Sequence, residues 1–300
     1  KGIKGMQTRE EDVVTKLFLS SNHSYLLYFT DMGRVYRTKT YNIPEAGRTA
    51  KGTPVVNIIE KSPEEKISEI IPVKEFSDNE YLVMVTKNGV IKKTPASEYE
   101  SIRKSGKIAI TLKEGDELIS IFKTTGNDNI FLATRNGMAI CFNENDARAV
   151  GRTASGVKAI DLADGDYVVG AEPVREDSKV LLVTDGGYGK CTDLTSFRIQ
   201  HRGGKGLKAY KITEKTGNII GISMVNDSEE LIMVTSEGVV IRIRIKDIAT
   251  TTGRITQGVR LINLNDGVIV VSMDKISAED TVEEESEENN TEVTAETTEE

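Results

Sequence analysis

Residues 81–92 read Tyr-Leu-Val-Met-Val-Thr-Lys-Asn-Gly-Val-Ile-Lys: an apolar run, a short polar turn that contains glycine, and a second apolar start. This pattern predicts a β-hairpin, because glycine accepts the positive φ that a tight turn requires. Residues 25–36 repeat the pattern as Tyr-Leu-Leu-Tyr-Phe-Thr-Asp-Met-Gly-Arg-Val-Tyr. It recurs three more times, so that five turn glycines lie 48 to 56 residues apart: Gly33, Gly89, Gly137, Gly187 and Gly238.

A second signature lies between the hairpins, where a basic loop with a glycine leads into a short apolar strand. Its glycines are spaced 50 to 54 residues apart: Gly2, Gly52, Gly106, Gly156, Gly206 and Gly258. In four copies an arginine precedes the glycine by four residues: Arg48, Arg152, Arg202 and Arg254. The copy at Gly106 has Arg103 and Lys104 instead.

Each unit of about fifty residues reads as four strands, which in one unit we expect at residues 53–59, 67–73, 81–86 and 90–94. Repeats of this length with four strands predict an all-β propeller built from blades. The hairpin strands are apolar at almost every position, as in residues 231–234, which indicates burial between neighbouring blades. A β-sandwich or a two-domain β protein is the alternative, and the regular period disfavours it.

The composition is that of a globular protein without a membrane span. The 300 residues are 38% hydrophobic and 29% charged, and no apolar run or opening segment fits a transmembrane helix or a signal peptide. The two cysteines, Cys141 and Cys191, form no disulfide framework, and free thiols suit a cytoplasmic location. The chain opens in mid-pattern at Lys1, so we interpret it as part of a longer protein.

The net charge of −8 is unevenly distributed along the chain. Residues 274–300 hold twelve acids and one base, a net charge of −11, whereas residues 1–273 hold 38 bases and 35 acids, a net charge of +3. We therefore expect a folded, mildly basic domain over residues 1–273 and an acidic, disordered tail over residues 274–300.

The basic loops resemble those of one known family, the C-terminal domain of DNA gyrase A. Its fingerprint is the box Gln-x-Arg-Gly-Gly-(Lys/Arg)-Gly, and residues 200–206 read Gln-His-Arg-Gly-Gly-Lys-Gly. Similar stretches are Gly33-Arg34-Val35-Tyr36-Arg37-Thr38, Gly47-Arg48-Thr49-Ala50-Lys51-Gly52 and Gly253-Arg254-Ile255-Thr256-Gln257-Gly258-Val259-Arg260. The resemblance covers residues 1–273.

The resemblance implies a propeller-like fold of six blades, the β-pinwheel, that wraps duplex DNA around its rim. In the family the functional box belongs to the first blade; here Lys1-Gly2-Ile3-Lys4-Gly5 looks like the end of such a box, and the match at 200–206 is a later copy. We therefore expect five complete blades and one incomplete blade. The nearest alternative is the corresponding C-terminal domain of topoisomerase IV, whose box is usually degraded.

The resemblance also implies partners: the rest of the gyrase A protein, together with gyrase B, in a heterotetramer. ATP, Mg²⁺ and the active-site tyrosine would belong to other parts of that topoisomerase, so we expect no cofactor in this domain and a monomer when it is isolated.

The physical reading of the basic loops agrees with this expectation. Wrapped DNA needs phosphate contacts at intervals along a curved surface, and a ring of blades repeats one loop at equal angles. Arginine grips phosphate oxygens through two donors, and glycines expose backbone N–H groups to an anion. The residues expected to contact DNA are Lys1, Lys4, Arg34, Arg37, Lys39, Arg48, Lys51, Arg103, Lys104, Lys107, Arg152, Lys158, Gln200, Arg202, Gly203, Gly204, Lys205, Lys208, Arg254 and Arg260.

Competing interpretations stay open for parts of this set. The glycines are also explained by the turns that they form, and any single basic residue could be a solvated charge without contact to DNA. Further bases near the hairpin turns fit either an exposed strand face or DNA contact: Lys92, Lys93, Lys190, Arg242 and Arg244. A propeller that binds an acidic partner protein through its rim is the second functional class.

No enzymatic motif emerges from the sequence. The only histidines are His23, in a turn, and His201, at the variable position of the box. The Gly-Lys pairs at 106–107, 189–190 and 204–205 are not followed by Ser or Thr, so no phosphate-binding Walker loop is present. The acidic clusters fit solvated turns better than a metal site.

Overall fold

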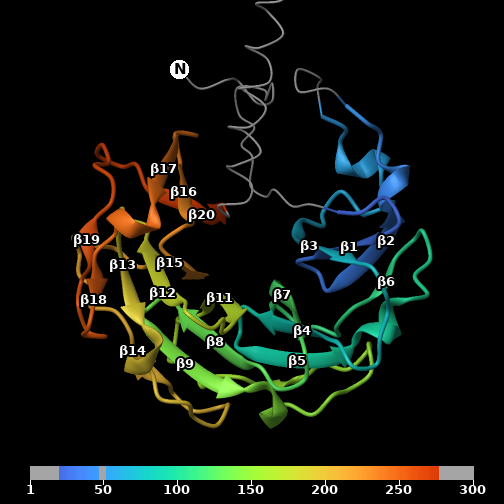
Figure 1. Ribbon diagram of the computed structural model, residues 1–300, viewed down its shortest axis with the longest axis horizontal. Helices are drawn as coiled ribbons and strands as arrows, with labels where there is room; N and C mark the ends of the chain where they lie inside the picture. The colour runs from blue at the N-terminus through green and yellow to red at the C-terminus, as the bar shows by residue number, and fades with distance from the viewer. Residues whose placement is uncertain (1–19, 47–51, 277–300) are drawn as a thin grey trace, which may run out of the picture.

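The computed structural model describes residues 20–46 and 52–276 as a ring of small β-sheets (Figure 1). Its five sheets follow the chain around the ring from β1 to β20. This arrangement confirms the prediction of an all-β, propeller-like pinwheel built from blades. The expected Lys1, Lys4, Arg48 and Lys51 lie outside the described residues.

The first three sheets share one strand order from the centre outward. The first contains β3 (Ile67–Val73), β1 (Tyr25–Thr30), β2 (Arg34–Lys39) and β6 (Lys107–Ile108). The second contains β7 (Leu118–Thr124), β4 (Tyr81–Thr86), β5 (Val90–Pro95) and β10 (Val157–Lys158). The third contains β11 (Val168–Pro173), β8 (Asn129–Thr134), β9 (Met138–Asn143) and β14 (Leu207–Lys208).

The last two sheets differ at their outer edges. The fourth contains β15 (Ile219–Val225), β12 (Lys179–Thr184) and β13 (Tyr188–Asp193), and β13 is flanked by β18 (Thr250–Thr251) and β19 (Val259–Arg260). The fifth contains only β20 (Val270–Ile276), β16 (Glu230–Thr235) and β17 (Val240–Arg244). It is the incomplete blade, so the described residues form four complete blades and one partial blade, not five and one.

The assignment of strands to blades also needs correction, because neighbouring repeats exchange strands. Strand β3 pairs with the hairpin that precedes it, not with β4 that follows. Each short outer strand comes from the basic loop after the next hairpin: β6 pairs with β2 and β10 with β5. The four strands of one sequence repeat therefore belong to different sheets.

Residues 53–59, expected as a strand, instead form a 3₁₀ turn at η2 (Val55–Asn57). Strand exchange supplies the reason, since the described residues contain no hairpin before β1 with which this segment could pair. Ile59 is buried and packs with Ile58 and Val55 on the open face of the first sheet, against Leu26 and Tyr28. Residues 53–59, which pair with no described sheet, thus cover the apolar face of the first blade.

A threonine explains why each hairpin turns at the same place. The hydroxyl oxygen of Thr86 accepts a hydrogen bond from the N–H of Val90 at 3.2 Å, across the turn that contains Gly89. The same bond occurs in the other four hairpins at 3.1–3.3 Å, where the N–H of the residue four positions later donates to Thr30, Thr134, Thr184 or Thr235. The turn glycines all have positive φ, between 75° and 86°.

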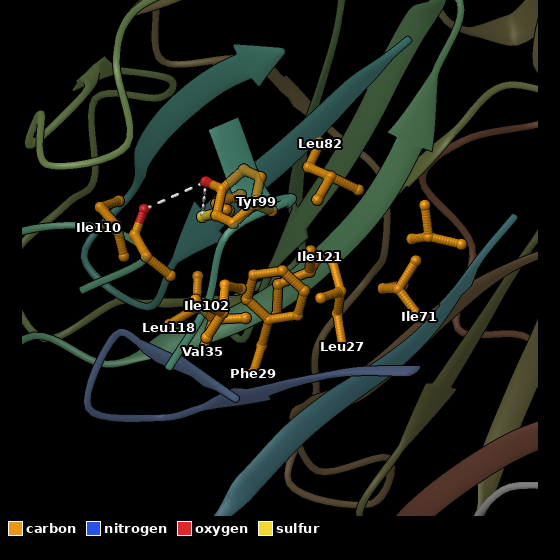
Figure 2. Close-up of a cluster of buried hydrophobic side chains, with 13 residues drawn as sticks. Leu27, Phe29, Val35, Ile71, Leu82, Tyr99, Ile102, Ile110, Leu118 and Ile121 are labelled. Atoms are coloured by element: carbon orange, nitrogen blue, oxygen red, sulfur yellow. Dashed lines mark hydrogen bonds between the residues drawn. The ribbon is translucent and has the colours of Figure 1, made fainter. Parts of the chain in front are cut away.

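The core lies between neighbouring blades rather than inside any one of them. Figure 2 shows the cluster between the first two sheets, where Phe29 and Leu27 of β1 meet Leu82 of β4. Tyr99 lies in the same cluster, and its hydroxyl donates to the carbonyl of Ala109 at 3.2 Å. Burial on both faces of the hairpins, as predicted, follows from this stacking.

The remaining turns are short 3₁₀ helices that follow the hairpins: η1 (Thr40–Asn42), η3 (Ala96–Tyr99), η4 (Glu144–Asp146), η5 (Leu194–Ser196) and η6 (Ile245–Asp247). None of the helices in the described ranges has the length and apolarity needed to span a bilayer. Cys141 and Cys191 are buried in equivalent strands, where burial raises the pKa of each thiol to about 11.

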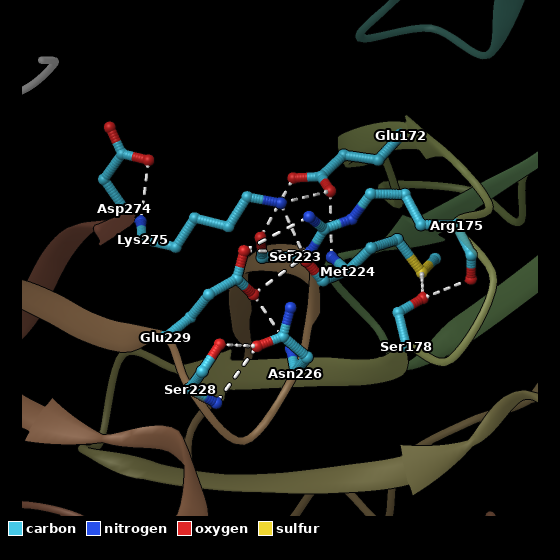
Figure 3. Close-up of polar contacts among 10 residues, drawn as sticks. All are labelled: Glu172, Arg175, Ser178, Ser223, Met224, Asn226, Ser228, Glu229, Asp274 and Lys275. Atoms are coloured by element: carbon cyan, nitrogen blue, oxygen red, sulfur yellow. Dashed lines mark hydrogen bonds and ion pairs between the residues drawn. The ribbon is translucent and has the colours of Figure 1, made fainter. Parts of the chain in front are cut away.

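A polar network joins the inner strands of the last three blades (Figure 3). The guanidinium of Arg175 forms an ion pair with Glu229 at 3.1 Å and donates to the Met224 carbonyl. Lys275 of β20 donates to the same carbonyl at 2.7 Å and lies 3.4 Å from Glu172. Strand β20 therefore continues to Ile276, three residues past the boundary expected between the domain and its tail.

Replacement of Glu229 should weaken the attachment of the last blade. In Glu229→Ala, the Arg175 guanidinium and the N–H of Asn226 lose their acceptor in a site where Glu229 is only 5% exposed. We expect a loss of about 1–3 kcal/mol in the free energy of unfolding, since Arg175 itself is partly solvated. Lys179→Ala, which breaks the exposed pair with Asp227, is the matched control and should cost below about 0.5 kcal/mol. Equal losses in denaturant titrations of the two variants would contradict this role.

Candidate nucleic-acid interface

The basic loops lie at the periphery of the ring. Four of the loops end in a two-residue strand, and these strands (β6, β10, β14 and β19) pair with the outer hairpin strand of their sheets. The third strands (β3, β7, β11, β15 and β20) neighbour one another at the centre instead (Figure 1). The described basic loops therefore lie along one common outer edge of the ring, where the periodicity predicted them.

In three of the basic loops the last glycine is required by close backbone contact. Gly206 has a φ of +73°, and a Cβ atom there would lie 2.4 Å from the carbonyl oxygen of Ala139 on β9. Gly156 and Gly258 approach Ile91 and Gly189 equally closely. These glycines allow the outer strand to reach its sheet, so their primary role is structural.

The other two glycines of the box differ from each other. Gly203 has a φ of +80°, and its N–H donates to the carbonyl of Ala159 at 2.6 Å. Gly204 is exposed and has an ordinary φ, and a Cβ atom there would meet nothing closer than 3.9 Å. Gly204 is thus the box glycine that the fold itself does not demand.

The loop arginines connect each loop to the one before it. Arg152 donates to the carbonyl of Ile108, Arg202 to that of Lys158 at 3.0 Å, and Arg254 to that of Lys208 at 3.2 Å. The acceptors occupy equivalent positions of successive outer strands. Each guanidinium has five N–H donors, so these bonds orient the group along the rim and leave further donors free.

Asp146 of η4 anchors the loop that contains the box. Its carboxylate accepts from the N–H of Arg202 at 3.1 Å and lies 3.2 Å from Nδ1 of His201. The backbone carbonyl of Asp146 accepts from Nε of Arg202 at 2.8 Å. Gln200 is half-buried, and its Nε2 has no acceptor within the described part of the chain.

Several expected hairpin cations already have partners within the protein. Arg34 lies 3.6 Å from Glu65 and donates to the Ser105 carbonyl at 2.8 Å. Arg37 and Lys39 both lie over the ring of Tyr25. Through these contacts the three side chains stabilise the first blade.

Two of the loop bases at the outer strands are also paired. Arg260 donates to the hydroxyl of Tyr188 at 3.0 Å, a bond that lowers the pKa of that phenol. Lys158 lies 2.9 Å from Asp161, and its bond lowers the pKa of that carboxyl. Both bases remain exposed at the rim.

Four expected cations are exposed, and no acceptor among the described residues engages their side chains: Arg103, Lys104, Lys205 and Lys208. Lys107 is half-buried and likewise unengaged by the described residues. These side chains are the ones best placed to meet an external anion.

The structure adds cations that the sequence reasoning missed or misplaced. Arg148 and Arg198 are exposed, and each precedes a loop arginine by four residues, a repeat that could have identified them. Lys92, Lys93 and Lys190, for which either an exposed strand face or DNA contact was expected, are instead almost completely buried. Lys93 forms a buried ion pair with Glu144 at 2.9 Å.

Comparison with known proteins assigns the chain to a family. The family model described as "DNA gyrase C-terminal domain, beta-propeller" matches residues 24–74, 80–125, 128–175, 178–226 and 229–277. Each match holds one hairpin and the inner strand that follows it, so each corresponds to one of the five sheets. The chain belongs to the DNA gyrase C-terminal domain family.

Relatives at higher identity are named as the A subunit of DNA gyrase. The chain is 54% identical over 280 residues to the protein of Halalkalibacterium halodurans and 49% identical over 280 residues to that of Clostridium acetobutylicum. Each match covers 93% of this chain and 34% of the relative, so the chain spans about a third of the length of these proteins.

Two solved structures share the fold of this gyrase-family domain. The C-terminal domain of DNA topoisomerase IV matches with a TM-score of 0.80 and 29% identity, over 86% of this chain and 80% of that one. A DNA gyrase A C-terminal domain matches with a TM-score of 0.73 and 24% identity, over 85% of this chain and 83% of that one. The described residues contain no group of His, Cys, Asp and Glu that could hold a metal ion.

Two glycine variants in one loop should show which box glycine the stability of the fold requires. Gly206→Ala places a methyl group against the Ala139 carbonyl at a positive φ, so we expect a loss of about 2–3 kcal/mol in the free energy of unfolding. Gly204→Ala should leave stability within about 0.5 kcal/mol. Thermal melting measures both, and an unchanged melting temperature for Gly206→Ala would show that the close contact is not required.

Proposed function

We propose that this domain is a non-catalytic DNA-binding module that holds duplex DNA on its outer rim and bends it around the ring. The observation that supports this most is the placement of exposed cations in the basic loops of the rim and at their outer strands, beside the first sheet at Arg103 and Lys104 and beside the third at Lys205 and Lys208. Phosphates recur at regular intervals along a duplex, and an outward-curved row of cations matches them without reading bases.

The charges on the two flat faces favour the rim over the faces. The chain crosses one face between outer and inner strands, where Glu114, Glu117 and Asp164 are exposed. It crosses the other face between inner strands and hairpins, where Glu176 and Asp227 are exposed. Carboxylates there would repel phosphates, so the lowest-energy path for DNA follows the edge.

Within a whole gyrase, wrapping would present a DNA segment to the catalytic parts with a fixed handedness. We propose that the chain serves this role beside the rest of the gyrase A protein and gyrase B, in the cytoplasm, and that ATP-driven strand passage elsewhere in the enzyme then introduces negative supercoils. Binding would lack sequence specificity but favour flexible DNA, because bending a duplex costs several kcal/mol.

Affinity for random-sequence duplex should fall steeply with salt. Neutralisation of about six phosphates implies a loss of about three decades between 50 and 200 mM salt. Simultaneous replacement of Arg103, Lys104, Lys205 and Lys208 by Ala should weaken binding and lower the slope of log K against log salt by about four. Fluorescence anisotropy across a salt series measures both quantities.

Lys74→Ala is the control, because Lys74 is exposed in the connection from β3 to β4, away from the outer strands. It should change neither affinity nor slope appreciably. A flat salt response of the parent domain, or binding of acidic proteins in preference to duplex, would contradict the DNA-wrapping proposal.

The acidic C-terminal segment would compete with DNA for the same rim. Residues 277–300 contain eleven acids and no base, and a tethered anion acts at high effective concentration. Removal of these residues, with the cut placed after the end of β20 at Ile276, should tighten duplex binding at low salt and less so at high salt. Unchanged affinity in the same anisotropy assay would reject self-competition.

A further inference from the structure

Two buried lysines lie beneath loops of the rim and form no ion pair with a carboxylate among the described residues. Lys92 of β5 is 1% exposed and Lys190 of β13 is 0% exposed. Each stands three residues after its hairpin glycine, in the second and the fourth sheet. A buried ammonium without a counter-ion is costly, so its surroundings should show what compensates the charge.

Backbone carbonyls of the basic loops compensate it. Nζ of Lys92 donates to the carbonyls of Arg152 and of Gly151, the latter at 3.3 Å, and to Ala109 at 2.5 Å. Nζ of Lys190 donates to the equivalent carbonyls, Arg254 at 2.5 Å and Gly253 at 3.4 Å, and to the Thr256 hydroxyl at 3.0 Å. Both ammonium groups therefore draw two successive carbonyls inward.

Inward carbonyls turn the neighbouring amides outward. All described peptide bonds are trans, and in a trans peptide the C=O and the N–H point in opposite directions. The N–H groups of Arg152 and Thr153 thus face away from Lys92, and those of Arg254 and Ile255 face away from Lys190. No acceptor within the described ranges bonds to these four N–H groups, and Thr153 and Ile255 are exposed.

The third sheet provides an internal contrast. It has Ile140 at the position of the lysine, and the loop above it is held by Asp146 instead. There the N–H of Arg202 donates to the Asp146 carboxylate and that of Gly203 to the Ala159 carbonyl. Among these three loops, two successive outward N–H groups without an acceptor in the described ranges occur only in the two loops that contact a buried lysine.

We propose that the amide pairs Arg152–Thr153 and Arg254–Ile255, oriented by Lys92 and Lys190, are two binding sites for DNA backbone phosphates. Successive N–H groups that point the same way form an anion-binding concavity, and the ammonium behind the loop adds positive potential. Each pair begins with a loop arginine, whose guanidinium donates to a carbonyl of the preceding outer strand. This inference rests on the proposed function, since duplex DNA would supply the phosphates.

The electrostatics couple the two sites to protonation. Burial, together with the charge of Arg152, lowers the pKa of Lys92 to about 7, and burial with the charge of Arg254 lowers that of Lys190 to about 8. The other ionisable groups that face them are Glu98, which raises the pKa of Lys92, and the phenols Tyr99 and Tyr210, whose own pKa values burial raises. A bound phosphate favours the ammonium form, so DNA binding should take up protons near neutral pH.

Amide chemical shifts of the wild-type domain test the sites without any substitution. On addition of a random-sequence duplex, the amide protons of Thr153 and Ile255 should move downfield, as expected for hydrogen bonds to phosphate. Those of Arg202 and Gly203, already bonded within the protein, should move much less. If duplex binds and the Thr153 and Ile255 amides do not move, the inference is wrong although the proposed function stands. If no duplex binds, the proposed function itself fails.

The lysines are tested by Lys92→Met with Lys190→Met, which keeps the apolar stem and removes the ammonium. We expect a folded domain whose duplex affinity is about tenfold weaker and whose salt slope is lower by about two. Wild-type affinity should fall as pH rises from about 6.5 to 9, and the double variant should lack most of that fall. Lys74→Met is the control for lost charge. A double variant with wild-type affinity and pH profile would overturn the role of the lysines.

Discussion

In four of the five described sheets, the outer edge of the hairpin is completed by a two-residue strand from the basic loop of the next repeat, and the rest of the molecule depends on this exchange. The third strand of a blade packs at the centre, and the hairpin fills the middle. The edge that remains can be satisfied only by a segment that returns from further along the chain. That segment is the end of a basic loop. The hydrogen bonds between the outer strand and the hairpin therefore place the cations of the loop at the rim.

The same constraint explains why so few rim residues are free. Gly156, Gly206 and Gly258 are required for the close approach of the outer strand to its sheet. Arg152, Arg202 and Arg254 connect successive loops through backbone carbonyls. These glycines and arginines hold the loops of the rim in place, whereas the exposed lysines and the outward N–H groups would contact a ligand. Loss of a loop arginine would thus disturb both the shape and the charge of the rim.

The repeat period was sufficient to predict the class of fold, the hairpins and the peripheral position of the loops, because each depends on local signals such as the Thr-x-x-Gly turn. Strand exchange escaped prediction, since nothing within one fifty-residue unit states that Ile67–Val73 pairs backward and not forward. The burial of Lys92 and Lys190 escaped for a related reason. Their carbonyl partners in the basic loops lie about sixty residues later in the chain and become neighbours only after the exchange.

The central claim is that DNA lies along the rim and not across a face, and proximity cross-linking tests it most directly. The native thiols are buried, so single cysteines at Lys104 and Lys208 on the rim, and at Glu114 and Glu176 on the two faces, can each hold a photoreactive group. The account predicts cross-links to random-sequence duplex from the two rim positions and few from either face. Efficient cross-linking from Glu114 or Glu176, with none from the rim, would contradict it.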